Sequence, residues 1–230
     1  MSNLRLSHIL CKVTDLHAAA ARLAADGFTF AWGSAPSVAH NALVWFDEGP
    51  FLELFVPASL DAPAAGTSLS PAIAGRFRRW AAAPDGWCDV ALESDAKDLD
   101  ATLARLAAAG VAAAALPRMS RTNPDGSVVS WAGLCPVDDD LPFAVSAYSE
   151  PQRPARTAHN NGANRVEQVI VATPDPAGYR RRLAALLGDE SAAAAWDIVE
   201  GPSFAVLGVR LRTNDGRTLE RTESLISTDP

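Results

Sequence analysis

Two side chains that could do chemistry lie on short apolar segments of strand character. His8 belongs to the segment RLSHILCK, where strand alternation places its imidazole on a face with leucine side chains. Glu53 belongs to FLELF, where its carboxylate shares a face with two phenyl rings. A carboxylate in such surroundings needs a cation or a hydrogen-bond donor, and apolar surroundings also shift its pKa toward that of a general base. Both residues are therefore candidates for the floor of a cleft.

Histidines in loops form a second group of candidates. His40 and Asn41 follow a loop of small residues, 33–39, that could admit a ligand, although an asparagine-supported turn needs no function. His159 opens the segment HNNG, where its imidazole could act as an acid, a base or a ligand. The alternative is again a turn, because Asn-Gly is a strong turn signal.

Arginine and tryptophan side chains could complete a binding site. Arg121 precedes the turn NPDG and could bind a carboxylate or carbonyl oxygen of a substrate, since a guanidinium favours planar anions. Trp45 and Trp131 lie on expected strands and could wall an aromatic ligand. The competing interpretations are a solvated arginine and core tryptophans.

A repeated pattern predicts the elements that position these residues. A strand-like run, a short turn and an amphipathic helix that ends at glycine occur three times, at 8–28, 88–111 and 168–188. Acidic residues suited to capping precede the helices, at Asp15, at Asp95 or Asp98, and at Asp175. The helices are expected to end at Gly27, Gly110 and Gly188.

Three further strand candidates follow each helix, so the chain is expected to be an α+β protein of three βαβββ modules. The modules span residues 1–60, 85–148 and 164–230, with connectors at 61–84 and 149–163. Residues 73–82 of the first connector could form a helix over the sheet or a lid. One module leaves an apolar sheet face uncovered, so modules should pair into curved mixed sheets around a cleft within one compact unit.

The order and spacing of several short segments resemble the glyoxalase-like branch of the vicinal oxygen chelate superfamily across most of the chain. The segments are LSHI at 6–9, the Asp15 turn and helix, HNAL at 40–43, FLEL at 51–54, Arg121 with NPDG at 123–126, LPF at 141–143, and HNNGA at 159–163. The resemblance implies a divalent metal ion, held by residues on the first and fourth strands of two paired modules.

Carried over to this sequence, the resemblance implies that His8 and Glu53 are metal ligands. The match is weaker in the other modules, where Cys88 or Gln168 corresponds to His8, and Ser146 or Glu220 corresponds to Glu53. The set His8, Glu53, Gln168 and Glu220 suits Zn, Ni, Fe or Mn, but requires the first and third modules to pair. Gln168 as a solvent-facing residue and Glu220 in a surface salt bridge are the alternatives.

The resemblance implies a metal-dependent lyase or isomerase that acts on a small oxygen-bearing metabolite. Extradiol dioxygenase chemistry is disfavoured, because its iron needs two histidines and a carboxylate, and His17 lies on an expected helix. One alternative is a non-catalytic binding or antibiotic-sequestering protein of the same fold. Another is an enzyme without metal, in which Glu53 or His159 is the general base. Proteins of this kind also form homodimers.

Composition limits the partners and the compartment. The net charge of −7 and the absence of a basic run argue against nucleic acid. No run of 18 apolar residues occurs, and the first ten residues, MSNLRLSHIL, do not resemble a signal peptide. Three cysteines in apolar runs suit reduced thiols, so we expect a cytoplasmic protein without a membrane partner. Nucleotide-binding, phosphate-loop, serine-hydrolase and HExxH motifs are absent from the sequence.

Overall fold

Helix signals in the sequence correspond to real helix ends in the computed structural model, which describes residues 4–57, 71–155, 157–222 and 225. Parts of the expected first and third modules and of both connectors lie outside these residues. Asp15 caps α1 (Leu16–Ala25) by accepting from the Ala18 amide at 2.9 Å. Asp175 caps α4 (Pro176–Leu187) through the Gly178 amide at 2.8 Å. Gly188 ends α4 with φ +74°, a conformation that glycine adopts without strain.

The second repeat departs from this pattern because its strand-to-helix turn is longer. Leu99 precedes α3 (Asp100–Ala108), and no side chain caps the helix. Asp98 instead accepts from the amide of Asp100 at 3.3 Å, and the expected acidic cap is therefore not formed.

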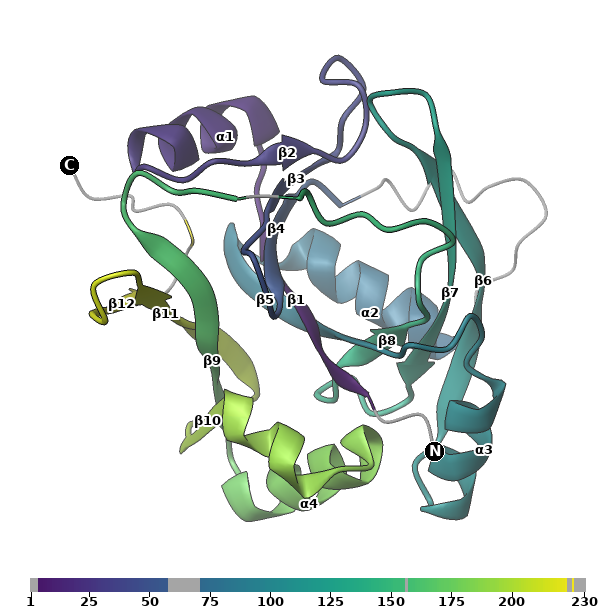
Figure 1. Cartoon of the computed structure of the whole chain (residues 1–230). Helices are drawn as coiled ribbons and strands as arrows, with labels where there is room; N and C mark the ends of the chain where they lie inside the picture. Colours follow the sequence, from purple (N-terminus) through teal and green to yellow (C-terminus); the bar gives the residue numbers. More distant parts are fainter. Residues whose placement is uncertain (1–3, 58–70, 156, 223–224, 226–230) are drawn as a thin grey trace.

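The first two modules share one curved eight-stranded mixed sheet, which confirms the predicted α+β fold. Its strand order is β2 (Ala31–Trp32), β3 (Asn41–Val44), β4 (Phe51–Phe55), β1 (Arg5–Lys12), β5 (Gly86–Glu93), β8 (Phe143–Val145), β7 (Val128–Pro136) and β6 (Ala113–Thr122). β1 and β5 meet antiparallel at the centre, and each pairs with a parallel strand, β4 or β8, on its outer side. In Figure 1 the sheet curls around α2 (Pro71–Ala82).

The third module forms a separate four-stranded sheet. Its order is β10 (Trp196–Glu200), β9 (Ala163–Thr173), β11 (Ala205–Thr213) and β12 (Thr218–Thr222), and the short 3-10 helix η1 (Glu190–Ala195) follows α4. Figure 1 shows this sheet and α4 beside the outer side of the large sheet. The first module therefore shares its sheet with the second, and the pairing of the first and third modules considered from sequence is wrong.

Apolar residues bury both faces of the large sheet. One core cluster packs the outer face against α1, α3, α4 and the small sheet; its members include Ile9, Leu52, Leu106, Val171 and Leu183. A second cluster lies on the inner face and includes Leu10, Phe55, Ala91 and Phe143, with Ile73 of α2 packed on it. The inner face is therefore partly filled by α2 and partly left to a cavity. Within the described residues, no helix is long and apolar enough to cross a membrane.

Candidate functional site

A cavity of ≈ 460 Å³ lies on the inner face of the large sheet, a size that suits a small organic molecule. Strands β1, β4, β6, β7 and β8 and helix α2 contribute to its wall. The polar lining residues are His8, His40, Asn41, Glu53, Ser120, Arg121 and Tyr148, and the aromatic ones include Phe51, Phe55, Phe77, Trp80, Trp131 and Phe143. His40, Asn41, Arg121 and Trp131 thus take the cleft positions expected from sequence.

His8 and Glu53 converge on the cavity floor. His8 Nε2 lies 3.4 Å from Glu53 Oε2, and the two side chains are only 6% and 17% exposed. The imidazole stacks on the ring of Phe51, with centroids 4.6 Å apart. Adjacent parallel strands explain the meeting, since Glu53 is paired with Leu10, and His8 and Leu10 share a face of β1.

Hydrogen bonds assign the proton of the His8 imidazole to Nδ1. Ser7 Oγ donates to Glu93 Oε2 at 3.0 Å, so the same hydroxyl accepts from His8 Nδ1 at 3.1 Å. The lone pair of Nε2 then faces Glu53, whose Oε1 accepts from Asn41 Nδ2 at 2.9 Å. If Glu53 were a carboxylate, its Oε2 and the Nε2 of His8 would be two acceptors facing each other. The contact is favourable when Glu53 carries a proton, which it can donate to Nε2.

Burial sets the charge of both groups. Burial lowers the pKa of His8 to about 3, and the charge of Arg121 adds to the effect, so the imidazole is neutral near pH 7. The His8–Glu53 contact is therefore not an ion pair. Burial raises the pKa of Glu53, while the Asn41 hydrogen bond and the charge of Arg121 oppose that rise. A carboxyl with a raised pKa next to a neutral imidazole is suited to accepting and returning a proton.

Three further polar groups line the cavity around this pair. Arg121 on β6 donates to the amide oxygens of Gln152 at 3.0 Å and Asn123 at 3.4 Å. Burial raises the pKa of Tyr148, so its hydroxyl keeps its proton and can donate to a ligand oxygen. His40 lies exposed at the rim, where partial burial and Arg121 lower the pKa of its imidazole.

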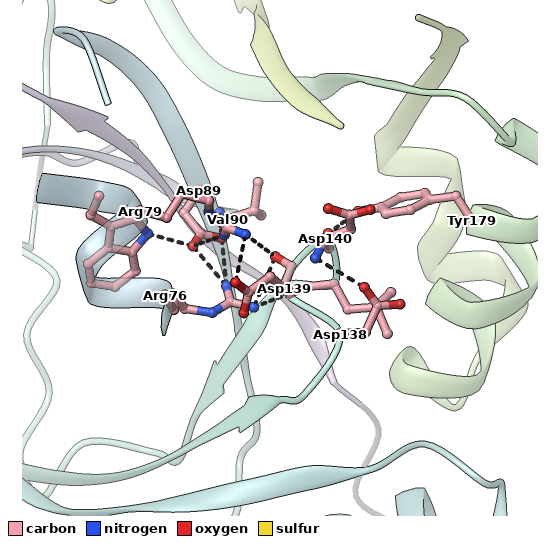
Figure 2. Close-up of polar contacts among 10 residues, drawn as sticks. Arg76, Arg79, Asp89, Val90, Asp138, Asp139, Asp140 and Tyr179 are labelled. Atoms are coloured by element: carbon pink, nitrogen blue, oxygen red, sulfur yellow. Dashed lines mark hydrogen bonds and ion pairs between the residues drawn. The ribbon is translucent and has the colours of Figure 1, made fainter. Parts of the chain in front are cut away.

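Helix α2 supplies the wall opposite the floor, and Asp89 on β5 anchors it. The Asp89 carboxylate accepts from Arg76 at 2.8 Å and 2.9 Å and from the Trp80 indole at 2.7 Å. Figure 2 shows Arg76 and Asp89 facing each other beside the chain that carries Asp138 to Asp140. Arg76 is 1% exposed and also donates to the Leu141 carbonyl at 2.6 Å. Anchored in this way, α2 holds the rings of Phe77 and Trp80 against the cavity.

Strand register identifies the counterparts of His8 and Glu53 in the second module. β1 and β5 are antiparallel, and the pair Ile9–Val90 lies at their centre. His8 comes one residue before this centre on β1, and Asp89 comes one residue before it on β5, so Asp89 holds the position equivalent to His8. By the same relation Ala91 is equivalent to Leu10. Because Leu10 pairs with Glu53 on β4 and Ala91 pairs with Phe143 on β8, Phe143 holds the position equivalent to Glu53. The counterparts expected from sequence, Cys88 and Ser146, are each displaced from these positions, because sequence similarity alone did not fix the register.

These counterparts do not complete the metal centre that the sequence resemblance implies. Asp89 is occupied by Arg76, whose positive charge takes the place that a cation would need. Phe143 offers no donor atom. Within the described residues, no group of three or more His, Cys, Asp or Glu side chains is placed to hold a metal ion. His8 and Glu53 supply two donors where a catalytic metal is usually held by three protein side chains, so the residues present do not fit the implied ion.

Gln168 and Glu220, expected as the remaining metal ligands, meet around an arginine on the small sheet. Arg210 donates to Gln168 Oε1 at 2.8 Å and to Glu220 Oε2 at 2.9 Å, and it forms an ion pair with Asp197 at 2.6 Å. Neither Gln168 nor Glu220 lines the cavity of His8. The proposed four-residue set is therefore not brought together, because the third module has its own sheet.

His159 and Trp45 also take structural places. His159 Nδ1 accepts from the amide of Thr29 at 3.0 Å, which leaves Nε2 to donate to the Trp45 carbonyl at 3.0 Å. Both ring nitrogens of His159 are thus hydrogen-bonded within the protein, and the residue does not line the cavity, so its geometry does not match the acid or base expected from sequence. The ring of Trp45 packs on Phe51, with centroids 4.1 Å apart, and does not line the cavity.

Sequence reasoning missed the residues that α2 and the second module bring to the site. Phe77 and Trp80 lie within residues 73–82, which the sequence predicts only as a helix or a lid, and Tyr148 is the last residue of the expected second module. The buried pair of Arg76 and Asp89 had one available signal, an acid within the apolar run WCDVAL. A buried acid needs a partner, and that need could have pointed to the arginines of the helix before it.

Comparisons with known proteins agree with this fold. Residues 6–187 match the family described as the glyoxalase-like domain. A hypothetical protein from Staphylococcus aureus has a similar structure, with a TM-score of 0.64 and 15% identity over 91% of each chain. The Mn(II)-bound glyoxalase from Novosphingobium aromaticivorans gives a TM-score of 0.54 and 15% identity, over 99% of this chain and 84% of that one. The search of curated proteins gives no match.

Proposed function

Because the chain belongs to the glyoxalase-like domain family and has the vicinal oxygen chelate fold, we propose that it is an enzyme that moves a proton on a small carbonyl compound, with Glu53 as the base. The observation that carries the proposal is the placement of the Glu53 carboxyl on the floor of the cavity, against a neutral His8. A base of this kind is effective when its pKa lies closer to neutrality than that of an ordinary carboxyl, and burial shifts Glu53 in that direction.

The proposed step uses groups that line the cavity. The Glu53 carboxylate takes a proton from the carbon next to the substrate carbonyl, and the C–H electron pair moves toward the carbonyl oxygen to give an enolate. The protonated hydroxyl of Tyr148 donates to that oxygen, which lowers the energy of the enolate. Return of the proton to the same or a neighbouring carbon gives an isomer, and loss of a leaving group from the enolate gives a lyase product.

His8 has a supporting part in this scheme. Its Nδ1 proton is held by Ser7, which fixes the ring with Nε2 toward Glu53. The lone pair of the neutral Nε2 accepts a hydrogen bond from the carboxyl that forms when Glu53 takes the proton, and this contact keeps the proton on Glu53, near the substrate. Asn41 holds the other carboxylate oxygen, which fixes the orientation of the base.

The proposed step does not use a Zn, Ni, Fe or Mn ion, although the sequence resemblance implies one. The reason is the donor set, since the positions equivalent to His8 and Glu53 hold an ion-paired aspartate and a phenyl ring. Mn(II) is bound in the glyoxalase from Novosphingobium aromaticivorans, and that protein shares only 15% of its residues with this chain.

Exchange of a substrate C–H proton for deuterium, catalysed by the protein, tests the proposal. Phenylacetone, which is neutral, and phenylpyruvate, which is a carboxylate, each carry an acidic C–H beside a carbonyl. In D₂O we expect the protein to accelerate the loss of that proton signal in NMR for at least one of them. Glu53→Gln should lower the rate by about 100-fold or more, the usual contribution of a general base. Glu48→Gln is the matched control, because Glu48 lies exposed in the turn before β4 and does not line the cavity.

A binding protein without catalysis is the competing function. It is favoured if either compound, or both, binds in the cavity and shifts protein NMR signals, yet exchange is no faster than in buffer. Exchange that is equally fast with Glu53→Gln would also refute the proposal, because it would assign the base elsewhere.

A further inference from the structure

Arg121 has no acidic partner within the described part of the chain. Its Nε and one terminal nitrogen donate to neutral amide oxygens, of Asn123 and Gln152. Its other terminal nitrogen has no acceptor among the described residues. Other arginines of the protein, such as Arg76 and Arg210, are paired with carboxylates. A partly buried guanidinium held by neutral groups keeps its charge available for an anion that comes from outside the chain.

The cavity is the place where such an anion would lie. Arg121 is part of the cavity wall, and among the described lining residues it is the sole arginine or lysine. Its charge acts on the groups around the floor: after burial, it is the second cause of the lowered pKa of His8 and of His40, and it opposes the rise that burial causes in the pKa of Glu53. Two neutral amides fix the guanidinium from one side, so the free edge is already oriented before a ligand binds.

Aromatic rings form most of the remaining wall. Phe77 and Trp80 approach from α2, Phe143 from β8 and Trp131 from β7. Asp89 holds the ring of Trp80, which donates its indole N–H to that carboxylate at 2.7 Å. Arg76, on the preceding turn of α2, binds the same carboxylate (Figure 2). Flat apolar walls favour a ligand with an aromatic or equally bulky apolar body.

The charges of the cavity suit one negative charge on the ligand. Glu53 is the other ionisable group of the floor that can be charged near pH 7, and it is held by Asn41 and His8 rather than by Arg121. Three of the five N–H groups of this guanidinium have no acceptor among the described residues, and two of them can bind the two oxygens of a carboxylate. A phosphate dianion would bring a second negative charge for which the described lining residues hold no further cation.

We infer that the cavity binds a monocarboxylate with an aromatic body, and that Arg121 is the residue that selects the carboxylate. The inference rests on the proposed function in one respect: it names the substrate class of the same cavity. It does not depend on Glu53 being a base.

Calorimetric titration with 2-naphthylacetate and its neutral amide, 2-naphthylacetamide, tests the inference. The two probes share an aromatic body and differ in charge. We expect the protein to bind the carboxylate at least about 10-fold more tightly, since a hydrogen bond to a charged group is worth more than a neutral one. Arg121→Gln should remove the preference, and Arg121→Lys should keep part of it. Arg118→Gln is the matched control, because Arg118 lies on the same strand, is exposed and does not line the cavity.

Equal affinity for both probes, failure of both to bind, or a preference that survives in Arg121→Gln would overturn the inference. Arg121→Lys retains the charge and covers the case in which the glutamine variant does not fold. Glu53→Gln separates the two proposals, because it should keep the carboxylate preference. Exchange of phenylacetone without a carboxylate preference refutes the substrate class alone, and a preference without any exchange refutes the proton-transfer function alone.

Discussion

In the second half of the large sheet, Asp89 holds the position that His8 holds in the first half, but the two side chains have different partners. His8 faces the cavity beside Glu53. Asp89 is bound by Arg76 of α2 in an ion pair whose side chains are 1% and 3% exposed. A curved sheet with two equivalent halves has thus become asymmetric: one half carries the polar floor, and the other anchors the helix that walls the cavity.

Disruption of the anchor should destabilise the protein. Asp89→Asn leaves the Arg76 guanidinium buried without a counter-charge, which typically costs about 3 to 5 kcal/mol. Arg79→Gln, on the same helix, removes an arginine that also contacts Asp89 but is 33% exposed, and should cost less than about 1 kcal/mol. Urea unfolding measures both. An Asp89→Asn protein as stable as the Arg79→Gln protein would show that the pair does not anchor α2.

The buried neutral histidine predicts a specific sensitivity to acid. The folded-state pKa of His8 is about 3, below its ordinary value of 6.5, so its contribution to stability is present above pH 6.5 and is lost as the pH falls toward 3. Between pH 7 and about pH 4 this loss is on the order of 3 kcal/mol. His8→Asn lacks the titrating group, so its unfolding free energy should fall by that much less over the same range. Parallel pH curves for the two proteins would contradict the assignment.

His159 should prove structural. Removal of its ring by His159→Ala loses two hydrogen bonds and its edge contacts with Phe28 and Phe46, a change expected to cost about 2 to 4 kcal/mol. At a temperature where the variant is folded, its affinity for a cavity ligand should equal that of the wild type. A variant with normal stability and no activity would restore His159 as a catalytic candidate.

The metal content of the purified protein tests whether its residues hold a divalent ion. Protein purified without chelators should contain well under one divalent ion per chain, and Mn²⁺, Zn²⁺ or Ni²⁺ at micromolar concentration should not raise its melting temperature, because a tightly bound ion would stabilise the folded state. About one ion per chain, lost in His8→Ala, would mean that two side chains suffice with water or substrate as further ligands.

The fold, and within the site the positions of His8 and Glu53, could be predicted from sequence because local signals specify them. Asp15 and Asp175 cap helices where expected, and the alternation around His8 and Glu53 correctly predicts that both face one cleft. Local signals do not state which modules share a sheet, and the prediction that Gln168 and Glu220 join His8 and Glu53 is wrong for that reason. Register across β1 and β5 is also a property of the assembled sheet, and it alone reveals Asp89 as the counterpart of His8.

The pH at which the Glu53 carboxyl loses its proton tests most directly whether this residue is the base. Infrared difference spectra between the wild type and Glu53→Gln, recorded across a pH titration, isolate the C=O band of this one carboxyl. We expect the band to persist above pH 4.5, the ordinary pKa of glutamate, and to disappear at higher pH as the carboxylate base forms. A band already lost at or below pH 4.5 would show that burial does not raise the pKa of Glu53, and the proposed base would lose its physical foundation.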